Sequence, residues 1–109
     1  MKVRWSEQAA LELAETAAYV ARKFGKQSAL NLRNTIDEAV GYIAQFPMIG
    51  VSSFTDEVTG IEFRELVCRL NSVIYTIYRE EIFIVSIWSN RQDRDKLYSA
   101  LRQTANEIK

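Results

Sequence analysis

Residues 60–94 read GIEFRELVCRLNSVIYTIYREEIFIVSIWSNRQDR, and this stretch decides the fold. Its apolar residues fall into three short runs separated by polar turns near Asn71 and Glu80, a pattern typical of three strands joined by tight connections. The third run, Ile82–Trp88, is apolar at nearly every position, which favours an interior place in a sheet. Three antiparallel strands are about the minimum that can hold an apolar face in water. We therefore expect the rest of the chain to pack on this sheet.

The first of these strands has an irregular pattern. Ile61 and Phe63 share one phase, whereas the apolar residues from Leu66 onward take the other. Either a bulge near Arg64 and Glu65 or a strand covered on both faces would reconcile the two phases. The pattern alone leaves both explanations open.

A helix pair is predicted before the sheet. Lys2–Trp5 alternates as a short half-buried strand, and Ser6 is a suitable N-cap for a first helix. Gly25 can adopt the positive φ that ends this helix, and Pro47 stops a second helix that begins near residue 27 or 28. Because the connection is so short, the two helices must run antiparallel as a hairpin. Their apolar stripes are formed by Ala10, Leu13, Ala14, Ala17, Val20, Ala21 and Phe24 on the first helix, and by Leu32, Ile36, Ala39, Val40 and Ile43 on the second.

The remaining segments complete one domain over residues 1–109. Residues 47–60, rich in Ser, Thr and Gly, predict a long loop, and Asp93 can cap a last helix. The predicted order is strand, helix, helix, strand, strand, strand, helix. This order is typical of an α+β fold, a two-layer sandwich in which a helix hairpin packs on a mainly antiparallel four-stranded sheet.

The composition restricts the chemistry. The 109 residues contain no histidine, which excludes Ser-His-Asp and Cys-His catalysis and every zinc site that needs imidazole. Cys68 is the single cysteine and cannot form an internal disulfide. Any proton transfer must use Glu, Asp, Lys, Tyr or Arg. The sequence implies no metal and no cofactor.

The charge and hydropathy restrict the partners and the location. Fourteen basic and fourteen acidic residues cancel, so wide contact with nucleic acid is not expected, and a protein partner or a small phosphate site is favoured. No run of about 18 apolar residues could span a membrane. The first residues turn polar before any signal-peptide apolar region could form, so we expect a cytoplasmic location.

Several short motifs occur in a characteristic order along most of the chain. They are Trp5-Ser6 with Ala10 and Leu13, Phe24-Gly25, Ala29 with Leu32, Phe46-Pro47 with Gly50, Arg64-Glu65-Leu66, Ile74-Tyr75-Thr76-Ile77, and Ile84 to Arg91. In this order and spacing they resemble the RelE/ParE superfamily, the toxins of bacterial type II toxin–antitoxin pairs. The resemblance implies a small toxin, associated with growth inhibition and plasmid stabilisation, that a cognate antitoxin neutralises. A homodimer or a heterotetramer with the antitoxin is a possible assembly.

The resemblance implies one of two activities. ParE-like toxins trap DNA gyrase, whereas RelE-like toxins cut messenger RNA in the ribosomal decoding site without a metal. In RelE-like nucleases basic and aromatic residues of the sheet carry the reaction, commonly aided by a lysine, a glutamate, a histidine or a C-terminal tyrosine. This chain has no histidine, no lysine between Lys26 and Lys96, and no terminal tyrosine. We therefore favour the ParE-like activity. A RelE-like mRNA endoribonuclease and a non-toxic binding module derived from the fold are the alternatives.

Two arginines are the main candidate site residues. Arg64 and Arg91 match the strand arginine of the superfamily and the arginine after its last strand. A rigid sheet that places two cations near each other could grip a phosphate or an acidic protein. Arg64 could instead pair with Glu62, and Arg91 could cap the last helix or join a surface ion pair. For RNA cleavage, Glu62 or Glu65 would be a candidate base, and Tyr75 or Tyr78 could donate a proton or stack on a nucleobase.

An antitoxin helix is expected to bind the helix hairpin, because its alanines would let another helix approach closely. The candidate contact residues are Leu13, Ala17, Ala21, Leu32 and Ile36.

Overall fold

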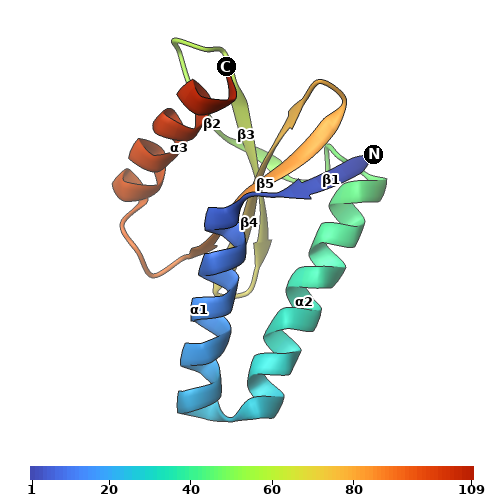
Figure 1. Cartoon of the computed structure of the whole chain (residues 1–109), viewed down its shortest axis with the longest axis vertical. Coiled ribbons are helices and arrows are strands. Elements are labelled where there is room, and N and C mark those ends of the chain that lie inside the picture. Colours follow the sequence, from blue (N-terminus) through green and yellow to red (C-terminus); the bar gives the residue numbers. More distant parts are fainter.

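A five-stranded sheet with helices on both faces forms the body of the molecule (Figure 1). The computed structural model describes all of residues 1–109. The strands lie in the order β1-β5-β4-β3-β2, and only β1 runs parallel to its neighbour. The elements in chain order are β1 (Lys2–Trp5), α1 (Glu7–Phe24), α2 (Lys26–Gln45), β2 (Val51–Thr55), β3 (Glu62–Cys68), β4 (Asn71–Tyr78), β5 (Glu81–Ser89) and α3 (Arg94–Ile108).

The α+β class, the helix hairpin and the mainly antiparallel sheet are confirmed, but the sheet has five strands and not four. The additional strand, β2, lies inside the predicted loop at residues 47–60 and pairs antiparallel with β3. Its serines and threonine resemble loop composition, and it is an edge strand, so no continuous apolar run marks it. Between the pairs Ser52–Arg64 and Phe54–Phe63 one residue of β2 is extra, which makes a bulge.

The sheet has a core on each face. The hairpin-side core lies between the sheet and α1 and α2, and the α3-side core lies under α3, so α3 adds a layer to the predicted sandwich. The hairpin-side core contains Ala9, Leu13, Ile36, Ala39, Ile43, Val73, Tyr75, Ile82, Ile84 and Ile87. The α3-side core contains Ile61, Phe63, Ile74, Val85, Trp88, Leu97, Leu101 and Ala105.

Coverage on both faces explains the irregular pattern of β3. Phe63 packs in the α3-side core, while Leu66 and Cys68 pack against the hairpin-side core. These positions fit one regular alternation, so the second of the two explanations holds and β3 itself needs no bulge.

The predicted helix ends are present. The Ser6 hydroxyl accepts a hydrogen bond from the Ala9 amide at 3.0 Å, and the Asp93 carboxylate accepts one from the Asp95 amide at 3.0 Å. Gly25 joins α1 to α2 with a φ of 95°, a conformation that suits glycine. None of the three helices has the length and apolar content needed to cross a membrane.

A carboxylate from α1 supports a bulge in β5. Ile74 lies opposite Ser86 while Tyr75 lies opposite Ile84, so β5 has one extra residue here. The Glu12 carboxylate accepts hydrogen bonds from the Ser86 hydroxyl at 2.9 Å and from the Ile87 amide at 3.2 Å. Burial nevertheless raises the pKa of the Glu12 carboxyl above its ordinary value. The folded state therefore binds this proton more tightly than the unfolded state does.

Glu12→Gln is expected to stabilise the protein at pH 7 by up to about 1 kcal/mol. A raised folded-state pKa means that stability is highest below the unfolded-state pKa and falls as the pH rises through the folded-state pKa. The amide keeps an acceptor oxygen for Ser86 and Ile87 without a charge to desolvate. Urea unfolding at pH 7 and pH 4 should show the gain at pH 7 only. Glu38→Gln, at an exposed position of α2, is the control, and a less stable Glu12→Gln protein at pH 7 would contradict the argument.

Candidate functional site

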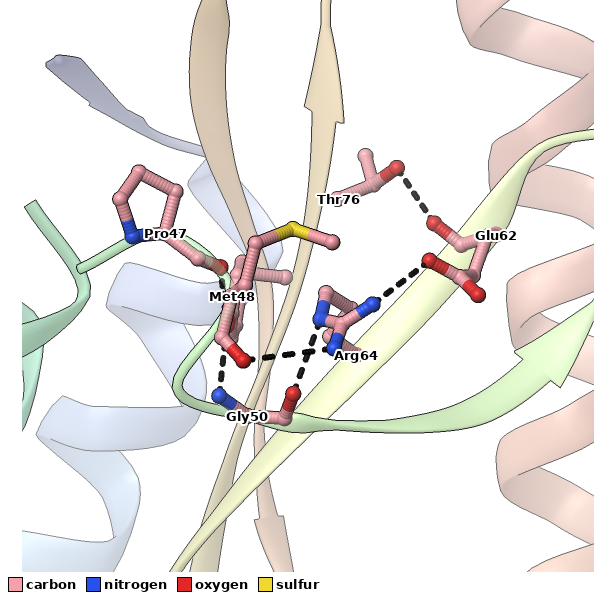
Figure 2. Close-up of polar contacts among 7 residues, drawn as sticks. Pro47, Met48, Gly50, Glu62, Arg64 and Thr76 are labelled. Atoms are coloured by element: carbon pink, nitrogen blue, oxygen red, sulfur yellow. Dashed lines mark hydrogen bonds and ion pairs between the residues drawn. The ribbon is translucent and has the colours of Figure 1, made fainter.

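Arg64 binds groups of its own chain. Its Nε donates to the Gly50 carbonyl at 2.8 Å, and a second nitrogen donates to the Met48 carbonyl at 3.3 Å. Its third nitrogen pairs with the Glu62 carboxylate at 2.9 Å (Figure 2). The Arg64 side chain is only 14% exposed. The guanidinium therefore holds residues 47–50, the Pro47–Gly50 turn, against β3.

Tyr75, on β4, binds the same turn through its hydroxyl. Its ring is fully buried, and its hydroxyl donates to the Pro47 carbonyl at 2.6 Å. The same hydroxyl accepts a hydrogen bond from the Gly50 amide at 2.9 Å. Arg64 and Tyr75 face each other as register partners on β3 and β4. Three predicted site residues, Arg64, Tyr75 and Glu62, thus lie together around the turn.

This arrangement has little capacity for proton transfer. The buried Tyr75 hydroxyl already donates one hydrogen bond and accepts another, and the charge of Arg64 is paired with Glu62. The Glu62 side chain is 44% exposed, and its carboxylate is paired with the Arg64 guanidinium. No group of Cys, Asp and Glu side chains comes close enough together to hold a metal ion. The cluster is therefore suited to making the turn rigid.

Arg91 lies apart from this cluster. It is exposed in the segment between β5 and α3, and it makes no hydrogen bond or ion pair. The amide of the adjacent Asn90 donates to the Leu70 carbonyl at 2.8 Å, which places this segment beside the β3–β4 turn. Arg64 lies four strand residues before the end of β3 at Cys68, or roughly 13 Å at the usual rise of a strand. No contact joins the two arginines, because Arg64 is bound to the Pro47–Gly50 turn while Arg91 lies beside the β3–β4 turn.

Comparison with known proteins gives the family. A family model described as the ParE toxin of the type II toxin–antitoxin system, parDE, matches residues 3–94. The chain belongs to the ParE toxin family. One solved structure, described as the chromosomal ParDE TA system from P. aeruginosa, is similar to this ParE-family chain with a TM-score of 0.66 and 25% sequence identity. That match covers 82% of this chain and 95% of the other. Among curated proteins there is no match.

The predicted resemblance to the RelE/ParE superfamily, with ParE favoured, is thus confirmed. The family match ends at Arg94, where α3 begins. Nearly all of α3 therefore lies outside the residues that this ParE-family chain shares with the family model.

A second polar cluster fixes the start of α3. Two nitrogens of Arg94 donate to the two oxygens of Glu65, each at 2.7 Å, and Arg94 also donates to Asn90 at 3.0 Å. The Ser53 hydroxyl adds a hydrogen bond to Glu65 at 3.0 Å. Hydrogen bonding to Arg94 lowers the pKa of Glu65 to about 2, so Glu65 stays ionised near neutral pH and is a poor general base. In this ParE-family chain the pair anchors the segment that carries Arg91.

The pairing of Glu65 with Arg94 was not predicted from the sequence, where Glu65 was only a candidate base. The alternation of side chains along β3 could have indicated this pair, because Glu65 lies on the same face of the strand as the buried Phe63. A carboxylate on a face that a helix covers needs a partner from that helix.

The predicted antitoxin contacts divide into two groups. Leu13, Ala17 and Ile36 are buried beneath the hairpin against the sheet. Ala21 and Leu32 are half-buried and lie nearer the α1–α2 connection. In this ParE-family fold only the second group borders on solvent, so the first group serves the core.

Proposed function

We propose that this chain is the toxin of a toxin–antitoxin pair and that it inhibits growth by binding a protein target, DNA gyrase. Membership of the ParE family supports the first part. The observation that carries the second is that the groups a nuclease would need are engaged within the chain. Arg64 pairs with Glu62 and bonds the Pro47–Gly50 turn, and Tyr75 bonds the same turn. The toxin acts in the cytoplasm, where a cognate antitoxin neutralises it.

Arg91 is the proposed target-binding residue. It is exposed and unpaired, so its guanidinium is available to a carboxylate of another protein. The Glu65–Arg94 pair and the hydrogen bond from Asn90 to Leu70 fix the segment on either side of it. A cation on an anchored segment loses less conformational entropy on binding than one on a free loop.

Arg91→Ala is expected to relieve growth arrest while leaving the stability of the protein nearly unchanged. An arginine in the centre of an interface typically contributes enough that its loss weakens binding roughly tenfold or more. Arg64→Ala should also relieve arrest, but through loss of stability, because it frees the Pro47–Gly50 turn. Colony counts after induction, with thermal melts of the purified variants, separate the two. Lys2→Ala, an exposed cation on β1, is the control, and full toxicity of Arg91→Ala would contradict the assignment.

The target can be tested with purified components. The chain is incubated with gyrase and supercoiled plasmid, and separately with translating ribosomes and message. Linear plasmid in the first reaction supports the proposal. Cleavage of message at codon spacing would replace it with the RelE-like nuclease, and no effect in either reaction would leave the inert binding module.

A further inference from the structure

A long stretch of chain at one edge of the sheet contains no charge. Residues 39–55 run from the second half of α2 through the Pro47–Gly50 turn to the end of β2, and they include no Asp, Glu, Lys or Arg. Charged residues make up 26% of the whole chain, so a stretch of this length without any is a clear depletion. Depletion of charge is a compositional mark of the centre of a protein–protein interface.

Large apolar side chains of the same stretch remain in solvent. Five of them are each between 43% and 66% exposed, and they are here named the edge patch. Apolar surface gathered in this way is uncommon on a protein that acts alone, and it marks an interaction site. The edge patch consists of Tyr42, Phe46, Met48, Ile49 and Val51.

The backbone holds the edge patch together. Tyr42 and Phe46 lie one helical turn apart at the end of α2, and the Ile49 amide donates to the Phe46 carbonyl at 2.9 Å. The Arg64 guanidinium binds the Met48 carbonyl, and so fixes the turn that follows (Figure 2). Because this surface is already rigid, a partner that binds it loses little free energy in ordering the chain.

The edge patch ends on a strand that has one free side. β2 is the last strand of the sheet and pairs only with β3, so its other side has backbone groups without a strand partner. The opposite edge strand, β1, carries Lys2 and Arg4, and charges of this kind discourage strand pairing. β2 has no such protection. The bulge between Ser52 and Phe54 confines regular pairing on β2 to the part near Val51.

We propose that the edge patch is the contact between two copies of this chain, related by a twofold axis that passes near Val51. The two β2 strands then lie antiparallel, and the apolar side chains of the two patches bury one another. Large side chains have roughly 150–250 Å² of surface each, so five that are about half exposed present roughly 500 Å² per copy. The contact then buries about 1,000 Å² in total, which reaches the lower limit of specific protein interfaces.

The absence of charge favours a second copy over a different protein. In a twofold contact each group near the axis faces its own counterpart, so a charge there would meet a like charge. The uncharged edge patch avoids this repulsion. A different partner is usually selected by complementary charge, but the edge patch offers none, since Arg64 is paired with Glu62 and Arg91 lies beside the β3–β4 turn.

The test measures the mass of the purified full chain by sedimentation equilibrium over a range of protein concentrations. The unaltered chain is expected to form a dimer. Val51→Lys and Val51→Glu each place two like charges across the axis, and each is expected to weaken dimerisation roughly tenfold or more. In an equal mixture of the two variants opposite charges face each other, so dimers are expected to form again.

Val58→Lys is the matched control, because Val58 is 89% exposed in the connection between β2 and β3 and lies outside the edge patch. Circular dichroism establishes that each variant is folded. A monomeric unaltered chain overturns the proposal, and so does a dimer that Val51→Lys leaves intact. A mixture of the two Val51 variants that stays monomeric overturns the twofold contact at this residue.

The inference does not depend on gyrase or on an antitoxin, because the measurement uses this chain alone. The two other occupants of the edge patch give different results. A monomeric chain whose Val51→Lys variant no longer acts in the gyrase reaction would assign the edge patch to the target. A monomeric chain whose Val51→Lys variant no longer binds a co-expressed antitoxin would assign it to that protein. Either result replaces the dimer.

Discussion

Gly50→Ala is expected to destabilise the fold by about 3 kcal/mol, because the site has no space for a methyl group. A Cβ at this position would lie 2.8 Å from the Tyr75 Cε1 and hydroxyl oxygen, and 3.0 Å from the Glu65 carbonyl oxygen. The Tyr75 ring is fully buried and its hydroxyl is bonded to Pro47 and to Gly50 itself, so it cannot move aside without losing those bonds. Overpacking and two broken buried hydrogen bonds would act together.

Urea unfolding followed by tryptophan fluorescence measures this loss. Gly41→Ala is the matched control, since Gly41 lies on exposed helix surface in α2 and an added Cβ meets no atom within 4 Å. That substitution should stabilise the protein by up to about 1 kcal/mol through helix propensity. If the two glycine variants changed stability in the same direction, the packing argument would fail.

Glu65→Gln is expected to destabilise the protein by about 2 kcal/mol at pH 7 and by little near pH 2. The Glu65 pKa is lowered from 4.5 to about 2 in the folded state, so its contribution is complete above pH 4.5 and disappears as the pH falls toward 2. The full shift would correspond to more, but the Arg94 side chain is 39% exposed and solvent screens part of the attraction. An amide in place of the carboxylate would leave Arg94 without its bidentate partner.

The measurement is urea unfolding of both proteins between pH 7 and pH 2. Glu81→Gln is the comparison, because Glu81 also pairs with an arginine, Arg4, but the Arg4 side chain is 52% exposed and the pair should matter little. A stability difference for Glu65→Gln that stayed constant across this pH range would exclude the ion pair as its cause.

The helix ends and the interior strand β5 were predicted correctly, because short stretches of sequence determine them. Ser6, Gly25 and Asp93 act within one helical turn, so their capping roles follow from neighbouring residues. The interior place of β5 follows from its apolar run. β2 was missed because an edge strand of Ser and Thr pairs with only one neighbour, and nothing in its composition distinguishes it from a loop.

The candidate site depended on contacts that are distant in sequence. The sequence identified Arg64 and its pairing with Glu62, but the two carbonyl acceptors of the guanidinium lie 14 and 16 residues away in a turn whose path the pattern does not reveal. Helical periodicity likewise gives the inner face of the hairpin without showing where the sheet ends. The pattern therefore does not distinguish Leu13 and Ile36, which lie in the core, from Leu32, which lines a groove.

The position of α3 after all five strands has a consequence for biosynthesis. Phe63 and Trp88 of the sheet pack against a helix that is translated later than every strand of that sheet. Until α3 has left the ribosome, one side of the sheet has no covering and the nascent polypeptide cannot complete this core. A message truncated just before Arg94 would yield a polypeptide with a bare apolar surface, a substrate for chaperones and proteases.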